Sequence, residues 1–152
     1  MPKASVKRLI ECNKDQLIDL VLDIDKYPEF VPFCLDAKVY DKNNEGDLIL
    51  IIADLTIGKG PFKDTYKSDV IYDKKKNTIF VKNIDGPLNH LSNNWTFSVK
   101  KDGITEITFD IDFEIKNKFL NSLMVVSFQF GLEKIADAFQ KRAEELFGNS
   151  KN

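Results

Sequence analysis

Cysteine is scarce in this chain of 152 residues, which contains only two. Neither Cys12 nor Cys34 belongs to a CxxC pair or shows the spacing of metal ligands. A redox motif and a structural zinc site are therefore not expected. We predict that both cysteines are reduced and buried, where they pack as small apolar side chains.

The sequence also lacks a long apolar run and an excess of one charge. No run approaches the roughly 20 apolar residues that a membrane-spanning helix needs, and none near the N-terminus has the pattern of a secretion signal. The chain carries 22 basic and 24 acidic side chains, whereas nucleic-acid-binding domains usually have a basic excess. We therefore expect one cytoplasmic globular domain over residues 1–152, with no DNA partner.

What the chain does contain is an apolar segment with two prolines, residues 23–34, DIDKYPEFVPFC. Pro28 and Pro32 each remove a backbone donor and disfavour the α conformation in the residue before them. We therefore predict a loop that is neither helix nor regular strand. Loops normally lie on the surface, so a loop this apolar is expected to cover something, to line something, or to touch an apolar partner.

Hydrophobic periodicity predicts the other elements. A strand at 4–12 precedes a helix that begins at the capping pattern of Asn13 and Gln16 and stops at Pro28. Six strands and a long helix follow, at 35–41, 47–57, 62–73, 77–84, 91–100, 104–115 and 117–147. A curved antiparallel sheet of about seven strands, with the long helix across its concave face, would bury the apolar faces. The predicted fold class is α+β.

The direction of each predicted strand determines at which end of the sheet the connecting loops lie. In an antiparallel meander, successive turns alternate between the two ends of the sheet. The turns at 58–61 and 84–90, the 23–34 segment and the start of the long helix therefore share one end, which is rich in apolar residues. Two interpretations stay open for residues 119–130 of the long helix, which are apolar on nearly every side. They pack under the 23–34 segment as core, or they form a lid over the mouth of a cavity, with Met124 as an adaptable wall.

Two polar residues fall on the inner face of the strand at 62–73. Alternation places Asp64 and Ser68 on the same face as Phe62 and Tyr66. Because a buried carboxylate without a partner is costly, these groups either hydrogen-bond to neighbours or line a space that holds water or a polar ligand head. A mostly apolar cavity with a few polar groups is typical of small-molecule sites.

With these residues assembled, the chain resembles the coenzyme-Q-binding branch of the START-like, helix-grip (polyketide cyclase/dehydrase) superfamily, which includes ribosome-association toxins. The resemblance covers about residues 4–147. Three motifs carry it: Asp23-x-x-x-Tyr27-Pro28-x-Phe30-x-Pro32-x-Cys34, Gly86-Pro87-Leu88-x-x-Leu91-x-x-x-Trp95-x-Phe97 and Ala138-Phe139-x-x-Arg142-Ala143. Position 33 is Phe where the family commonly has Trp, and position 88 is Leu where Phe is common, so both remain apolar.

The resemblance implies an internal hydrophobic cavity that binds a polyprenyl quinone such as ubiquinone, in support of respiration or quinone synthesis, with no required cofactor. Tyr27, Phe30, Pro32 and Phe33 would form its gate. Asp64 and Ser68 would contact the head group. The other expected ligand-binding residues are Phe62, Tyr66, Leu88, Leu91, Trp95, Phe97, Phe109, Phe113, Leu120, Leu123 and Met124.

Two alternatives remain. One is a toxin-like protein that binds the large ribosomal subunit and blocks subunit joining, although a near-neutral charge is unusual for an rRNA binder. The other is an enzyme, but the one histidine, His90, falls in a predicted loop, and no nucleophile–base spacing is present. We therefore predict a binding protein without catalytic residues. The 27–34 loop and the start of the long helix are expected to touch the inner membrane transiently.

Overall fold

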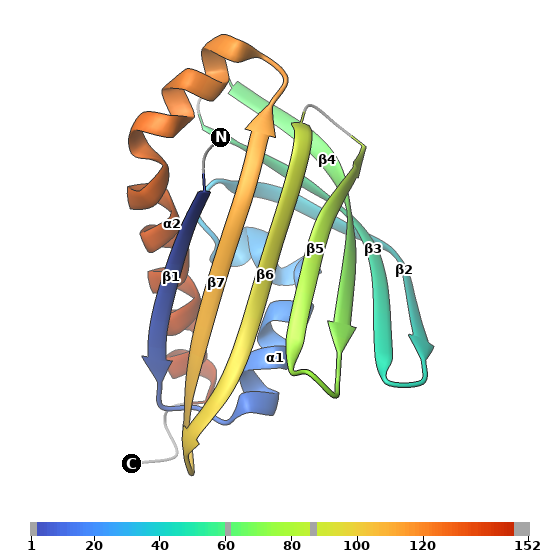
Figure 1. Cartoon of the computed structure of the whole chain (residues 1–152), viewed down its shortest axis with the longest axis vertical. Coiled ribbons are helices and arrows are strands. Elements are labelled where there is room, and N and C mark those ends of the chain that lie inside the picture. The colour runs from blue at the N-terminus through green and yellow to red at the C-terminus, as the bar shows by residue number, and fades with distance from the viewer. Residues whose placement is uncertain (1–2, 60–61, 86–87, 148–152) are drawn as a thin grey trace.

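The computed structural model describes residues 3–59, 62–85 and 88–147 (Figure 1). Within these ranges, the side chains at 59, 62, 85, 88, 89, 115, 120, 121 and 123–128 are not described. The elements are β1 (Lys3–Ile10), α1 (Lys14–Leu22), the 3₁₀ helix η1 (Ile24–Glu29), β2 (Cys34–Glu45), β3 (Leu48–Lys59), β4 (Phe62–Asp73), β5 (Thr78–Asp85), β6 (Leu88–Lys101), β7 (Ile104–Ile115) and α2 (Lys118–Phe147).

The described strands form one antiparallel sheet in the order β1-β7-β6-β5-β4-β3-β2. The sheet curves so that β2 and β3 turn away from the plane of β1, β7 and β6 (Figure 1). The long helix α2 packs along β1 and β7 and also contacts α1. The predicted α+β fold, a curved antiparallel sheet with a long C-terminal helix, is confirmed.

The register confirms the predicted grouping of loops. Cys34 at the start of β2 pairs with Ile57 near the end of β3, and Leu88 at the start of β6 pairs with Ile115 at the end of β7. The start of β2 and the start of α2 therefore lie at the same end of the sheet (Figure 1). We call this end of the molecule the loop pole.

The 23–34 segment is partly helical, so the prediction of a loop was wrong there. In η1 the amide of Phe30 donates to the carbonyl of Tyr27 at 3.1 Å, and the amide of Lys26 donates to that of Asp23 at 3.1 Å. The fixed φ of Pro28 suits a 3₁₀ turn, and its missing donor removes only one hydrogen bond. Pro28 limits the segment to a short, tight helix but does not exclude one. It does not end α1 either, which stops at Leu22.

Two other predicted loop segments are strand. Residues 43–45 extend β2 because Gly46, at φ 62, makes the tight turn that follows them. A side chain in this left-handed conformation would be strained. Residues 88–90 extend β6, so His90 lies in a strand, where it pairs with Glu114.

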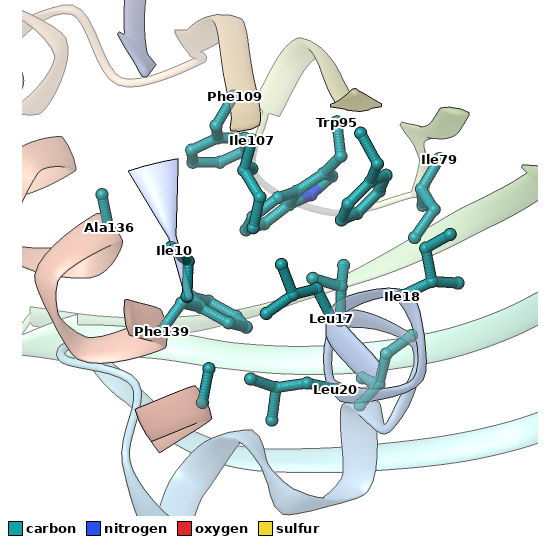
Figure 2. Packing of buried hydrophobic residues seen from close by; sticks show 14 of the residues in the cluster. Ile10, Leu17, Ile18, Leu20, Ile79, Trp95, Ile107, Phe109, Ala136 and Phe139 are labelled. Carbon is teal, nitrogen blue, oxygen red and sulfur yellow. The ribbon is translucent and has the colours of Figure 1, made fainter. Parts of the chain in front are cut away.

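The main core lies between the sheet, α1 and the C-terminal half of α2 (Figure 2). Trp95 and Phe109 stack with their ring centroids 4.2 Å apart, and Phe139 of α2 meets Trp95 edge-on at 5.0 Å. A cavity of about 10 Å³ remains among these rings, which is about the space of a single water molecule. The described part of this core is therefore close-packed.

The C-terminal half of α2 buries or partly buries its apolar residues, with the exception of Leu146. Leu132, Phe139 and Ala143 are at most 4% exposed, whereas Leu146 is 52% exposed. Leu146 lies in the last turn of α2, which ends at Phe147, so the apolar periodicity continues slightly beyond the residues that pack.

Candidate functional site

A smaller apolar cluster lies on the inner face of the sheet, toward the loop pole. Leu91 and Phe113, each 6% exposed, pair across β6 and β7, and Tyr66 and Ile111 pack against them. Tyr66 reaches this cluster from β4, across β5. We call these four residues the inner-face cluster; Tyr66, Leu91 and Phe113 are among the predicted ligand-binding residues.

Asn93 lies beside the inner-face cluster, next to Ile111, which also packs against the main core. It lies between Leu91 and Trp95 on the inner face of β6 and pairs with Val81 and Ile111 on the neighbouring strands. Its Oδ1 is buried and has no hydrogen-bond partner among the described residues. Asn93 is not among the predicted site residues, whose inner-face polar groups all lie at 62–73. The alternation Leu91, Asn93, Trp95, Phe97 contains the same signal.

Tyr66 and Tyr27 lie deep in the fold and still keep accessible surface. Desolvation by burial raises the pKa of both phenols above the usual range, yet both residues are only partly buried. The hydroxyl of Tyr27 donates to the carbonyl of Val21. The hydroxyl of Tyr66 has no hydrogen-bond partner within the described part of the chain. A deep side chain with free surface and an unused hydroxyl is suited to contact a ligand.

The first half of the predicted gate is held against α2. The rings of Tyr27 and Phe30 meet Phe139 edge-on, at 5.4 and 5.1 Å between centroids. Arg142 donates to the Glu29 carboxylate at 2.8 Å, and its guanidinium lies 5.0 Å from the centre of the Phe30 ring. Two of the sequence motifs, near residues 27–30 and 139–142, therefore pack on each other.

The second half of the predicted gate is more exposed. Phe33 is 38% exposed and has a φ of 69, a left-handed conformation that bulky residues rarely adopt. Its carbonyl accepts a 2.9 Å hydrogen bond from the amide of Gly58. Its ring lies over α2 at Gly131, where an added Cβ would be 3.8 Å from Cε2. Pro32 beside it is partly buried.

The two expected head-group contacts are in different environments. Ser68 is 1% exposed, and its hydroxyl donates to the carbonyl of Ala53 at 3.1 Å. Asp64 is exposed, and its Oδ1 accepts from the amide of Thr65 at 2.9 Å. The expected inner-face burial of Asp64 was wrong because β4 extends past the core there: its pairing partner Ile57 is also 36% exposed.

The remaining predicted site residues fall into two groups. Trp95, Phe97 and Phe109 are 3–6% exposed and belong to the main core. The other side chains lie outside those that the structure describes; they are Phe62, Leu88, Leu120, Leu123 and Met124.

Cys12 and Cys34 are both buried, which confirms that part of the prediction made for them. Cys34 lies at the first position of β2, beside the loop pole, and is 8% exposed. Burial raises the pKa of its thiol from 9.0 to about 11. The thiol is therefore protonated and weakly reactive at neutral pH.

One pair of titratable side chains on β6 and β7 lies on the face of the sheet opposite to the inner-face cluster. His90 Nε2 is 3.0 Å from Asp112 Oδ1, on the face of the sheet opposite to Leu91, and this hydrogen bond lowers the pKa of Asp112. The described residues contain no cluster of His, Cys, Asp or Glu that could hold a metal ion. None of the helices within the described ranges combines the length and apolar character that crossing a membrane requires.

Comparison with known families gives one match over most of the chain. Residues 10–140 match the family described as polyketide cyclase / dehydrase and lipid transport. The matched residues begin at the end of β1 and include the loop pole, the inner-face cluster and Phe139, whereas Arg142 lies just beyond them.

Two curated relatives are similar over most of this chain. A ribosome association toxin from Rickettsia prowazekii is 32% identical over 142 residues, which is 91% of this chain and 94% of the relative. A mitochondrial coenzyme Q-binding protein from Dictyostelium discoideum is 31% identical over 140 residues, 90% of this chain and 66% of the relative. Their names describe different functions.

A solved structure shows the same fold. A START superfamily protein from Mycobacterium smegmatis superposes with a TM-score of 0.79 at 18% identity, covering 95% of this chain and 98% of the other. The START-like architecture expected from the sequence is therefore confirmed.

Proposed function

Because the chain belongs to the polyketide cyclase / dehydrase and lipid transport family, we propose that it binds a hydrophobic small molecule, a polyprenyl quinone, at the inner-face cluster. The observation that carries the proposal is Tyr66, which is deep and partly accessible, lies next to Leu91 and Phe113, and has no partner for its hydroxyl among the described residues. The similarity to a coenzyme Q-binding protein supports a quinone as the ligand.

Burial of the isoprenoid tail would supply most of the free energy of binding a polyprenyl quinone. Burial of one methylene group contributes roughly 0.8 kcal/mol, so one five-carbon isoprene unit contributes about 3–4 kcal/mol. A ligand with a tail longer than the site would leave it at the loop pole, beside Phe33. The exposed position of Phe33 over α2 supports its role as the outer part of the gate.

The loop pole also supports the expected contact with a membrane. Phe33, Phe119 and Phe130 are 38%, 69% and 64% exposed, and the last two belong to α2. Exposed aromatic side chains enter the interface of a bilayer readily. Sedimentation with vesicles of neutral phospholipid tests this contact: Phe119→Ala and Phe130→Ala should reduce binding, and Val99→Ala, at the opposite end of the sheet, should not.

Organic extraction followed by mass spectrometry tests the proposed function. Protein purified from a quinone-making host should release a polyprenyl quinone, and an unrelated protein purified in parallel should not. Leu91→Trp would fill the inner-face cluster and should abolish the signal. Leu9→Trp is the matched control because Leu9 is 59% exposed. A wild-type protein that neither carries nor takes up any polyprenyl lipid would contradict the proposal.

The similarity to a ribosome association toxin favours a second candidate function, binding to the large ribosomal subunit. Sucrose-gradient sedimentation of ribosomes at low magnesium tests it. Binding would shift the protein into the large-subunit fractions and reduce the peak of joined subunits. A profile that excess protein leaves unchanged would remove this candidate.

We also propose that the protein binds its ligand without chemical turnover. The names of both relatives describe binding or association and not a reaction. Ligand recovered after long incubation with the protein should be unchanged in mass, and any new product that depends on the protein would contradict this.

A further inference from the structure

Asn93 has no evident structural task in the sheet. Its neighbours along the inner face of β6, Leu91 and Trp95, are each 6% exposed and apolar. Its partners across the strands, Val81 and Ile111, are apolar as well. An amide oxygen that is buried among such residues without a partner costs free energy, and Asn93 Oδ1 is in this state as far as the described residues are concerned. A leucine at this position would avoid that cost.

A second amide nearby shows the contrast. Asn83 of β5 lies on the same face, and its Oδ1 accepts a 2.8 Å hydrogen bond from the amide of Leu91. The described pairing of β5 with β6 runs only from Thr78 and Thr96 to Lys82 and Ser92. The side chain of Asn83 thus continues the contact between the strands where the backbone pairing ends. Asn83 supports the sheet, whereas Asn93 Oδ1, beside the inner-face cluster, has no partner in the part of the chain that the structure describes.

We propose that Asn93 is the polar subsite that holds the head group of the ligand, and that this head group is uncharged. The inference rests on the proposed function and adds to it the residue and the ligand chemistry. By turning about χ2, an amide offers either its oxygen to a hydroxyl or its N–H to a carbonyl. One residue can therefore bind a quinone and also the corresponding quinol.

The placement of charges favours an uncharged head. The two arginines of the chain are already paired: Arg8 with Asp137 at 3.0 Å and Arg142 with Glu29 at 2.8 Å. The inner-face cluster and the strand partners of Asn93 carry no charge. A carboxylate or phosphate placed there would be desolvated without a counter-charge, which is strongly unfavourable.

The test replaces the amide with an apolar side chain of similar size. Asn93→Leu should lower the affinity for decylubiquinone, a short-tailed quinone, by about tenfold. It should leave the affinity for dodecylbenzene, which has no polar head, unchanged or higher. Asn94→Leu is the matched control, since Asn94 is the next residue and faces the other side of the sheet. Its affinity for both probes should equal that of the wild type.

Stability gives an independent readout. If Asn93 serves the ligand and not the fold, Asn93→Leu should raise the urea midpoint of the ligand-free protein while it weakens quinone binding. A structural asparagine would give a lower midpoint. Asn93→Ala, measured in parallel, removes the amide without adding volume and should show the same loss of quinone affinity, so the test does not depend on one variant.

The outcomes separate this inference from the proposed function. If the wild type binds decylubiquinone and both Asn93 variants bind it within twofold, the polar subsite is wrong and the proposed function stands. If the wild type binds neither probe, the proposed function itself fails. Wild-type protein that binds dodecanoate more tightly than decylubiquinone at neutral pH would overturn the preference for an uncharged head.

Discussion

Arg142 of α2 and Glu29 of η1 form an ion pair with an Nη2–Oε1 distance of 2.8 Å, although 113 positions separate them in the sequence. The guanidinium also lies 5.0 Å from the centre of the Phe30 ring. The Arg142 side chain therefore holds η1 and Phe30 against α2, both through the ion pair and through its contact with the ring.

Replacing Arg142 should cost more than replacing Glu29. Arg142→Ala removes both the ion pair and the packing on Phe30, and we expect a loss of about 1–2 kcal/mol in the free energy of unfolding. The Glu29 side chain is 52% exposed, so Glu29→Ala should cost less than about 1 kcal/mol. Urea unfolding measures both values. Equal losses would show that the ion pair alone matters.

The backbone at Phe33 predicts an unusual order of substitutions. At a φ of 69, a residue with a Cβ is strained by about 1–2 kcal/mol relative to glycine. Phe33→Gly should therefore be more stable than Phe33→Ala by about 0.5–1 kcal/mol, after the entropic cost of glycine in the unfolded chain. The control is Val31, which is not among the residues with positive φ: there glycine should be less stable than alanine. The same order at both positions would contradict a strained Phe33.

The stacked pair Trp95 and Phe109 should dominate the stability of the main core. Phe109→Ala removes a ring that is 5% exposed and should cost about 3–5 kcal/mol. The fluorescence of Trp95, the only tryptophan in the chain, should change because its stacking partner is lost. Phe130→Ala, at a position that is 64% exposed, should change the stability by less than about 0.5 kcal/mol.

The raised pKa of Cys34 predicts that the stability of the folded protein depends on pH in the alkaline range. Because its pKa is raised from 9.0 to about 11 in the folded protein, the folded state favours the protonated thiol. The resulting stability is fully present below pH 9.0 and is lost as the pH rises toward 11. Urea unfolding across this range should show a steeper fall for the wild type than for Cys34→Ala, and parallel curves would contradict the shift.

Thiol reactivity provides a second measurement on Cys34. In a Cys12→Ala background, the reaction with an aromatic disulfide reagent at pH 8 should be about 100-fold slower in the folded protein than in concentrated urea. Equal rates in the two states would mean that the thiol is accessible and unshifted.

The sequence predicted the strands well wherever one face meets water. From Glu106 to Ile115 polar and apolar residues alternate without a break, and β7 spans Ile104–Ile115 as predicted. The prediction of loops from proline and turn residues was less accurate. Pro28 permitted a 3₁₀ helix, and residues 43–45 and 88–90 joined strands because pairing with their neighbours satisfied their backbone groups.

The site was harder to predict than the fold. Alternation assigns a residue to a face of a strand, but it does not tell how far the core extends along that face, and Asp64 lies beyond it. Periodicity also gives no information on contacts between distant segments, such as Arg142 with Glu29. Asn93 could have been found, because the alternation of β6 places one amide among apolar residues.

Photolabelling with a ubiquinone analogue that carries a photoreactive group on its ring tests the central claim most directly. Peptide mapping by mass spectrometry should place the label on β4 and β6, near Tyr66, Leu91 and Asn93, and excess decylubiquinone should remove it. The outer-face residue Asn94 and the distant Leu146 serve as internal references. Labelling spread over the outer surface, or unaffected by the competitor, would contradict binding at the inner-face cluster.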